Sequence, residues 1–174
     1  MTALQRAFVA VIPPPSVLGW ADAAQNSAAA VAPDLRWTRL DQRHLTLRFL
    51  GAVPDPAAAA GFVADAVRAR EPFTLSLGGG GAFPDPRRAS VLWLGVREGL
   101  DALTELATAL ASPDDRPFRA HLTLARANPP RDLRQVVAAL DGCGESEPWT
   151  VDELVLFDSD RSVHTEVARF RLAG

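Results

Sequence analysis

Two stretches of the chain repeat one tetrapeptide, His44-Leu45-Thr46-Leu47 and His121-Leu122-Thr123-Leu124. Each copy alternates polar and apolar residues, which is typical of a strand with one face in the core. His and Thr therefore share one face, and the two Leu point into the core. The chain has only three His, so by composition the probability of a chance repeat is on the order of one per cent or less. The pattern favours one shared site over two separate core histidines.

Two imidazoles on opposing strands could divide the proton transfers that open a phosphodiester. One proton must leave the attacking oxygen, and another must reach the leaving oxygen on the opposite side of phosphorus. An imidazole with a pKa of about 6.5 exists in either form near neutral pH. The hydroxyls of Thr46 and Thr123 could donate hydrogen bonds to the non-bridging phosphate oxygens. His44 and His121 are therefore the predicted acid–base pair.

Strand alternation adds two arginines to the predicted phosphate site. Arg48 follows His44 by four residues and Arg119 precedes His121 by two, so strict alternation places both on the His faces. Planar guanidinium groups suit bidentate contacts to phosphate. The alternative is that both are ordinary surface arginines at strand ends.

A metal site and a serine nucleophile fit the sequence less well. Thr is a poor zinc ligand, no His-x-His or His-Glu-x-x-His spacing occurs, and a third ligand would have to be His164 or a carboxylate. No Gly-x-Ser-x-Gly elbow is present either. We expect neither a metal nor an organic cofactor.

The composition fits one two-lobed domain over residues 1–174, with 48% hydrophobic content for its core. A net charge of −3 argues against a broad surface that tracks nucleic-acid phosphates. The single Cys143 excludes an intramolecular disulfide. The apolar stretch 7–12 is too short for a signal peptide or a membrane span. We expect a cytoplasmic monomer that does not bind membranes.

The remaining pattern predicts an α+β fold with two similar halves. Expected strands cover 6–12, 35–38, 43–50, 73–77, 91–96, 118–126, 150–157 and 164–172, the last two as a hairpin. Expected helices cover 13–32, 57–70, 99–111 and 131–140. Because each half holds one motif strand, we expect two antiparallel sheets facing each other across a pseudo-two-fold cleft, with helices outside.

Two segments are expected to interrupt the regular structure. Gly78–Gly81 predicts a flexible turn, since glycine runs disfavour helices and central strands. A phosphate-binding loop is the weaker alternative, because no Lys-Ser/Thr pair follows and no dinucleotide fingerprint fits. Asn128-Pro129-Pro130 is expected to end the second motif strand.

The motifs and their surroundings resemble the two-histidine (2H) phosphoesterase superfamily, and within it the LigT-like RNA 2′,3′-cyclic phosphodiesterases. Similar blocks occur in the family's order along nearly the whole chain, at 6–10, 44–51, 81–84, 91–96, 121–126 and 151–159. The resemblance implies a bilobal α+β fold. It also implies metal-independent hydrolysis of a 2′,3′-cyclic phosphate at an RNA end, such as that of a tRNA fragment, to a 2′-phosphomonoester.

The resemblance also assigns roles to residues. It implies that His44 is the proton donor and His121 the proton acceptor, and that Thr46 and Thr123 bind phosphate. Arg126 matches an arginine of the family motif, although strict alternation turns its side chain away from His121.

The chain departs from the family near its C-terminus, where His164 stands in place of a frequent Tyr. This change affects the expected contact at the cleft rim and leaves the acid–base pair intact. The alternative function is a non-catalytic module that binds RNA ends or nucleotides. The presence of both His and both Thr favours an enzyme, because a binding module needs no acid–base groups.

Overall fold

The computed structural model of the protein describes residues 2–173. Its large antiparallel sheet has the strand order β10-β9-β1-β3-β7-β6-β5, with β2 paired to β7, and β4 pairs with β8 separately. The strands are β1 Leu4–Val11, β2 Arg36–Trp37, β3 Leu45–Val53, β4 Phe73–Leu75, β5 Leu77–Asp85, β6 Arg88–Val96, β7 Leu122–Arg131, β8 Trp149–Val151, β9 Glu153–Asp160 and β10 Val163–Arg171. The α-helices are α1 Pro15–Ala29, α2 Pro56–Val67, α3 Leu100–Leu110 and α4 Arg134–Asp141.

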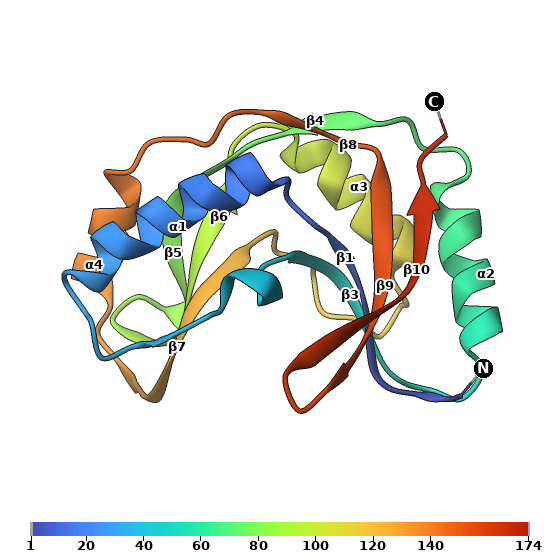
Figure 1. Ribbon diagram of the computed structural model, residues 1–174, viewed down its shortest axis with the longest axis horizontal. Coiled ribbons are helices and arrows are strands. Elements are labelled where there is room, and N and C mark those ends of the chain that lie inside the picture. The colour runs from blue at the N-terminus through green and yellow to red at the C-terminus, as the bar shows by residue number, and fades with distance from the viewer. Residues whose placement is uncertain (1, 174) are drawn as a thin grey trace.

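The large sheet consists of two four-stranded halves that meet at one point. Strands β3 and β7 share a single antiparallel pair, Leu45 with Leu122. One half contains β10, β9, β1 and β3, and the other contains β7, β6, β5 and β2. In Figure 1 these halves form two arms that meet where β3 passes β7. The expected α+β class and antiparallel architecture are confirmed, and the two halves are continuous through this junction.

The hydrophobic core lies between the sheet and the helices. In β1, Ala7, Val9 and Val11 belong to the core, whereas the intervening Phe8 and Ala10 are buried on the opposite face. Helix α1 packs beside α4 and α2 beside α3 (Figure 1). This arrangement leaves the opposite face of both halves free to line a cleft. Among residues 2–173, no helix is both long and apolar enough to cross a membrane.

The expected flexible turn at Gly78–Gly81 is wrong, because these glycines lie inside β5. The strand is at the edge of the sheet, where glycine is better tolerated than in a central strand. Close packing explains why residue 81 must be glycine. A Cβ there would come within 2.1 Å of the indole of Trp93. The expected stop at Asn128 is also wrong, since β7 continues to Arg131, which pairs with Ala89 of β6.

Candidate active site

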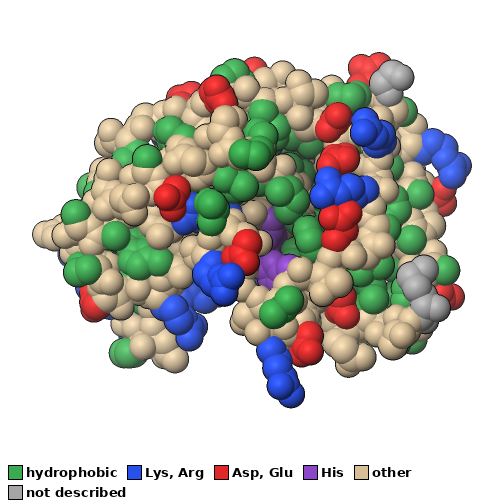
Figure 2. All heavy atoms as spheres, in the orientation of Figure 1, with side chains coloured by type: hydrophobic (Ala, Val, Ile, Leu, Met, Phe, Trp, Pro, Cys, Tyr) green, Lys and Arg blue, Asp and Glu red, His purple; other side chains and the backbone are tan. Residues whose placement is uncertain are grey.

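His44 and His121 occupy equivalent positions, each immediately before a strand of the sheet junction. The two motif strands are paired in antiparallel register at the first Leu of each copy. Extending this register by one residue places His44 across from Thr123 and His121 across from Thr46. The His side chains lie in the hollow between the two halves (Figure 2). The fold therefore assembles one site from both copies of the motif.

The two imidazoles are held in the same way. Nδ1 of His44 lies 2.8 Å from the carbonyl oxygen of Gln42, and Nδ1 of His121 lies 2.7 Å from that of Arg119. A carbonyl oxygen only accepts, so Nδ1 carries the hydrogen in each ring. Nε2 of each neutral ring is then left as the atom that can take up a proton.

The surroundings of His44 are apolar and include a second histidine. Phe8 stacks on the His44 ring with centroids 4.7 Å apart, and His164 meets it edge-on at 5.2 Å. Burial lowers the pKa of His44 to about 4, and the charges of His164 and His121 act in the same direction, against the hydrogen bond to Gln42. His44 is therefore neutral at pH 7 in the free protein.

The surroundings of His121 combine aromatic rings with arginines. Phe83 meets the His121 ring edge-on at 4.9 Å, and the Trp93 ring lies 6.3 Å away. Burial lowers the pKa of His121, the hydrogen bond to the Arg119 carbonyl opposes this, and the charges of Arg126 and Arg119 lower it further. His121 is thus also neutral at pH 7 in the free protein.

A β-bulge in β7 brings Arg126 onto the cleft face. Thr123 pairs with Trp93, but after a register shift Arg126 pairs with Val91. Trp93 and Val91 are two residues apart in β6 and share one face, and paired residues of neighbouring strands lie on the same face. Arg126 therefore faces the cleft with Thr123. The expectation that alternation turns Arg126 away from His121 is wrong, because the alternation is broken at the bulge.

The equivalent bulge in β3 has the opposite consequence for Arg48. Thr46 pairs with Ala10, whereas Arg48 pairs with Val9, the next residue of β1. Since Ala10 and Val9 point to opposite faces, Arg48 lies on the helix-covered face and not on the face of Thr46. The next residue, Phe49, returns to the cleft face opposite Phe8.

The contacts of Arg48 agree with this placement and correct the expectation that it lines the cleft. Its guanidinium donates to the Leu110 carbonyl and to Ser112 Oγ at 2.7 Å, and it pairs with Asp115 at 3.1 Å. It also lies over the Phe62 ring, 5.5 Å from its centroid. Arg48 thus connects β3 to α2 and to the end of α3.

His164 is brought to the site by the β9–β10 hairpin. Its ring packs edge-on against Phe8 at 5.0 Å, in addition to its contact with His44. The Gln42 side chain donates to the carbonyl of Ser162, so the segment before β3 is tied to the hairpin tip. Burial lowers the pKa of His164, and the charge of Asp41 opposes this shift.

Sequence reasoning identified both histidines but missed the aromatic rings that surround them. Phe8, Phe83 and Trp93 all lie in the blocks that resemble family sequences, which was the available signal. Their contacts with the histidines depend on strand pairing, which alternation alone does not reveal. Among residues 2–173, no group of three or more His, Cys, Asp or Glu side chains is arranged to hold a metal ion.

Comparisons with known proteins match most of the chain to one family. The family model of the 2′-5′ RNA ligase superfamily matches residues 13–163. An RNA 2′,3′-cyclic phosphodiesterase of Aeropyrum pernix is 33% identical over 136 residues, which cover 74% of this chain and 77% of that protein.

Two crystal structures share the fold over nearly their whole length. TT0787 of Thermus thermophilus has a TM-score of 0.72 and 27% identity, covering 97% of this chain and 98% of that one. Escherichia coli LigT complexed with phosphate has a TM-score of 0.72 and 26% identity, covering 99% of this chain and 100% of that one.

Proposed function

Because the chain belongs to the 2′-5′ RNA ligase superfamily, we propose that it hydrolyses a 2′,3′-cyclic phosphate at an RNA end to a 2′-phosphomonoester. The observation that carries this proposal is the pair of imidazoles held by matching hydrogen bonds on facing motif strands. Each has an Nε2 that can exchange a proton. The name of the Aeropyrum relative, an RNA 2′,3′-cyclic phosphodiesterase, supports the choice of substrate.

The proposed reaction is one in-line displacement at phosphorus. Nε2 of His121 takes a proton from a water molecule, whose oxygen attacks phosphorus. The bond from phosphorus to O3′ breaks, and O3′ receives the proton of His44. The phosphate stays on O2′. The assignment of donor and acceptor follows the family resemblance, and the origin of the two imidazoles on different motif strands suits in-line displacement.

Threonine hydroxyls and arginines complete the proposed phosphate site. Thr46 and Thr123 lie on the cleft face beside the histidines, where their hydroxyls can donate to the non-bridging oxygens. Arg126 faces the same cleft, and Arg119 lies next to His121. Fixed donors and positive charge stabilise the negative charge that develops in the transition state.

His44 has a pKa of about 4 and is neutral in the free protein at pH 7. The proposed mechanism therefore requires that substrate binding favours its protonation. A bound phosphate places negative charge beside the imidazole, and an opposite charge nearby raises the pKa of a base. The proposed donor therefore acquires its proton in the complex with the anionic substrate. The neutral His121 is ready to act as the base.

The test is to offer the purified protein a short RNA that ends in a 2′,3′-cyclic phosphate and to identify the product by mass spectrometry and by migration against synthetic 2′- and 3′-phosphate standards. We expect a 2′-phosphate and the same rate in excess chelator, because side chains supply every role in the proposed mechanism. Binding without turnover would instead support the RNA-end binding module. Loss of activity in chelator, with recovery on adding one divalent ion, would contradict the metal-free mechanism.

We further propose that residues 1–174 act as one two-lobed domain, since the site needs both halves. We propose a cytoplasmic monomer that acts on RNA fragments such as those of tRNA. Size-exclusion chromatography with light scattering measures the molar mass in solution and tests whether the protein is a monomer.

A further inference from the structure

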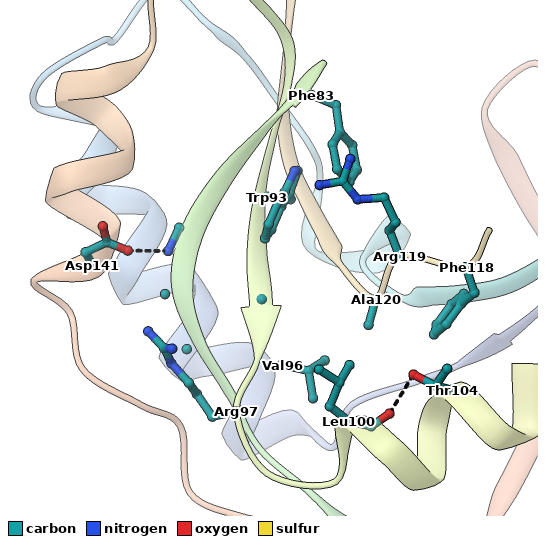
Figure 3. A pocket seen from close by; sticks show the side chains of 14 residues that line it. Phe83, Trp93, Val96, Arg97, Leu100, Thr104, Phe118, Arg119, Ala120 and Asp141 are labelled. Atoms are coloured by element: carbon teal, nitrogen blue, oxygen red, sulfur yellow. Dashed lines mark hydrogen bonds between the residues drawn. The ribbon is translucent and has the colours of Figure 1, made fainter. Parts of the chain in front are cut away.

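A pocket of about 430 Å³ opens beside His121 on the second half of the sheet. Three of its lining residues, Phe83, Trp93 and Arg119, also surround His121, so the pocket continues directly from the proposed reaction centre. From there it runs along β6 to Arg97 and is bounded by α3 (Figure 3). Of its lining, sequence reasoning had singled out Arg119 and the glycines of β5, the glycines with a phosphate-binding loop as the weaker alternative.

The walls of the pocket offer flat apolar surfaces. Trp93 and Phe118 line it, and the part of β5 that borders it is bare backbone at Gly78–Gly80. Trp93 lies directly against Gly81, where any Cβ would clash with its indole ring. The glycine run therefore positions this indole and keeps side chains out of the pocket. Aromatic faces of this kind stack with nucleobases with little dependence on sequence.

The pocket also carries positive charge. Arg97 and Arg119 line it, and neither is among the arginines that form ion pairs with carboxylates in residues 2–173. The guanidinium of Arg97 lies over Gly79, with Nη2 2.5 Å from where a Cβ would be. The single lining carboxylate, Asp141, accepts a hydrogen bond from the Gly80 amide at 2.7 Å. Arginines without a carboxylate partner suit a phosphate group.

We propose that this pocket binds the nucleotide preceding the cyclic-phosphate nucleotide in the RNA, with its base against Trp93 and Phe118 and a backbone phosphate near Arg97. The volume lies within the usual range for small-molecule sites, about 300–1,000 Å³. The pocket adjoins the proposed reaction centre, as the next unit of a covalently linked substrate requires. The inference rests on the proposed function and extends it from a cyclic phosphate to an RNA chain.

The test compares a nucleoside 2′,3′-cyclic phosphate with a dinucleotide that ends in the same cyclic nucleotide. We expect kcat/KM of the native protein to be about ten-fold higher for the dinucleotide, the scale of one base stacked on an aromatic ring. Arg97→Ala should reduce this gain by removing the phosphate contact and leave the rate with the mononucleotide unchanged. Thr104→Trp, which puts a bulky ring into the pocket from α3, should also reduce the gain and leave that rate unchanged.

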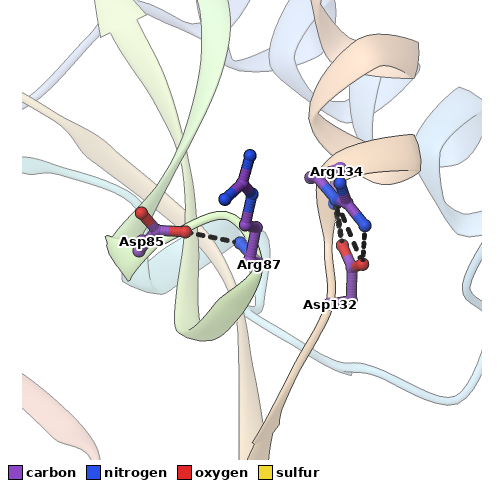
Figure 4. A network of polar contacts seen from close by, with 4 residues as sticks. All are labelled: Asp85, Arg87, Asp132 and Arg134. Atoms are coloured by element: carbon purple, nitrogen blue, oxygen red, sulfur yellow. Dashed lines mark hydrogen bonds and ion pairs between the residues drawn. The ribbon is translucent and has the colours of Figure 1, made fainter.

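Arg87→Ala is the matched control. Arg87 is another exposed arginine of the β5–β6 hairpin, but it lies at the turn, where its backbone amide bonds to Asp85 and it does not line the pocket (Figure 4). This variant should keep the dinucleotide preference. Equal rates with both substrates in the native protein, or equal losses on both in Arg97→Ala, would overturn the inference. If neither substrate turns over, the proposed function fails, and the pocket is then tested by dinucleotide binding, which Arg97→Ala should weaken and Arg87→Ala should not.

Discussion

The two sides of the hollow between the sheet halves have the same backbone and different chemistry. Each side holds its histidine by a hydrogen bond from Nδ1 to the carbonyl two residues earlier, and each motif strand has a bulge after its Thr. On one side His44 lies among Phe8 and His164, and on the other side His121 lies near arginines. The repeated motif therefore fixes geometry, and the neighbouring strands determine proton affinity and charge.

The clearest difference occurs at the fifth residue after each histidine. The bulge turns this residue into the cleft in both halves, and it is Phe49 in one half and Arg126 in the other. Arg126 adds a positive charge to the His121 side, whereas the corresponding residue on the His44 side is an uncharged aromatic ring. The same backbone thus presents an arginine on one side and an aromatic ring on the other.

The strongest test of the shared geometry is to remove each histidine. We expect His44→Ala and His121→Ala each to lower kcat by roughly 10²-fold or more, because each loses a general acid or base. Melting temperatures should show that both variants fold. Turnover close to that of the native protein in either variant would remove that histidine from the mechanism.

The second test uses the pH dependence of the free energy of unfolding to test whether His44 is buried among apolar groups. The pKa of His44 is about 4 in the folded protein and about 6.5 when unfolded. As the pH falls, the unfolded state therefore binds the proton first. The contribution of the neutral His44 to the free energy of unfolding is fully present above pH 6.5 and is lost as the pH falls toward 4. The loss should reach roughly 3 kcal/mol.

Urea unfolding of the native protein and His44→Gln at pH 7.5 and pH 4.5 measures this contribution. The variant lacks the titrating imidazole, so the acid loss of unfolding free energy should be smaller in it. Equal acid losses in the two proteins would show that His44 is not buried as described.

The third test compares the arginine that follows the bulge in β7 with the arginine that follows the bulge in β3. Arg126→Ala should raise KM for the RNA substrate about ten-fold, because a charge-assisted contact to phosphate is worth roughly 1.5–3 kcal/mol. Its melting temperature should change little, since Arg126 is exposed. Arg48→Ala is the comparison: it should leave KM unchanged and lower the melting temperature, because Arg48 joins β3 to the end of α3. The reverse result would contradict the face assignments at both bulges.

The smallest expected effect concerns His164. Its charge lowers the pKa of His44, so His164→Tyr should raise that pKa, and an NMR titration of the His44 ring measures the shift. The charge of Asp41 acts on His164, and Glu166 lies two residues further along β10. The fold should be retained, because a ring remains against Phe8. If the pKa of His44 is unchanged in this variant, the role of His164 is limited to packing against Phe8 and His44.

Alternation and helix signals were sufficient to predict most of the elements, and the repeated motif predicted that the two histidine strands meet. Alternation failed where the side-chain period of two is interrupted. Leu124 and Ala125 are consecutive buried apolar residues, and this was the visible sign of the bulge that turns Arg126 inward. The bulge in β3 has no such sign, since the polar Arg48 is largely covered by segments distant in the sequence. The glycines of β5 were misassigned because the residues that pack against them, such as Trp93 at Gly81 and Leu140 at Gly80, lie on other elements.

The position of β1 in the sheet governs when the site can form during synthesis. β1 lies between β3 and β9, and the Gln5 amide donates to the Asp158 side chain, 153 residues away in sequence. Bringing such distant segments together is slow, because loop closure is needed before the contacts can stabilise it. The strands that flank His121 have been synthesised once the ribosome has passed Arg131. The half of the sheet that holds His44 also needs β9 and β10, which are synthesised later. A nascent chain therefore carries both histidine motifs well before the hollow that holds them is complete.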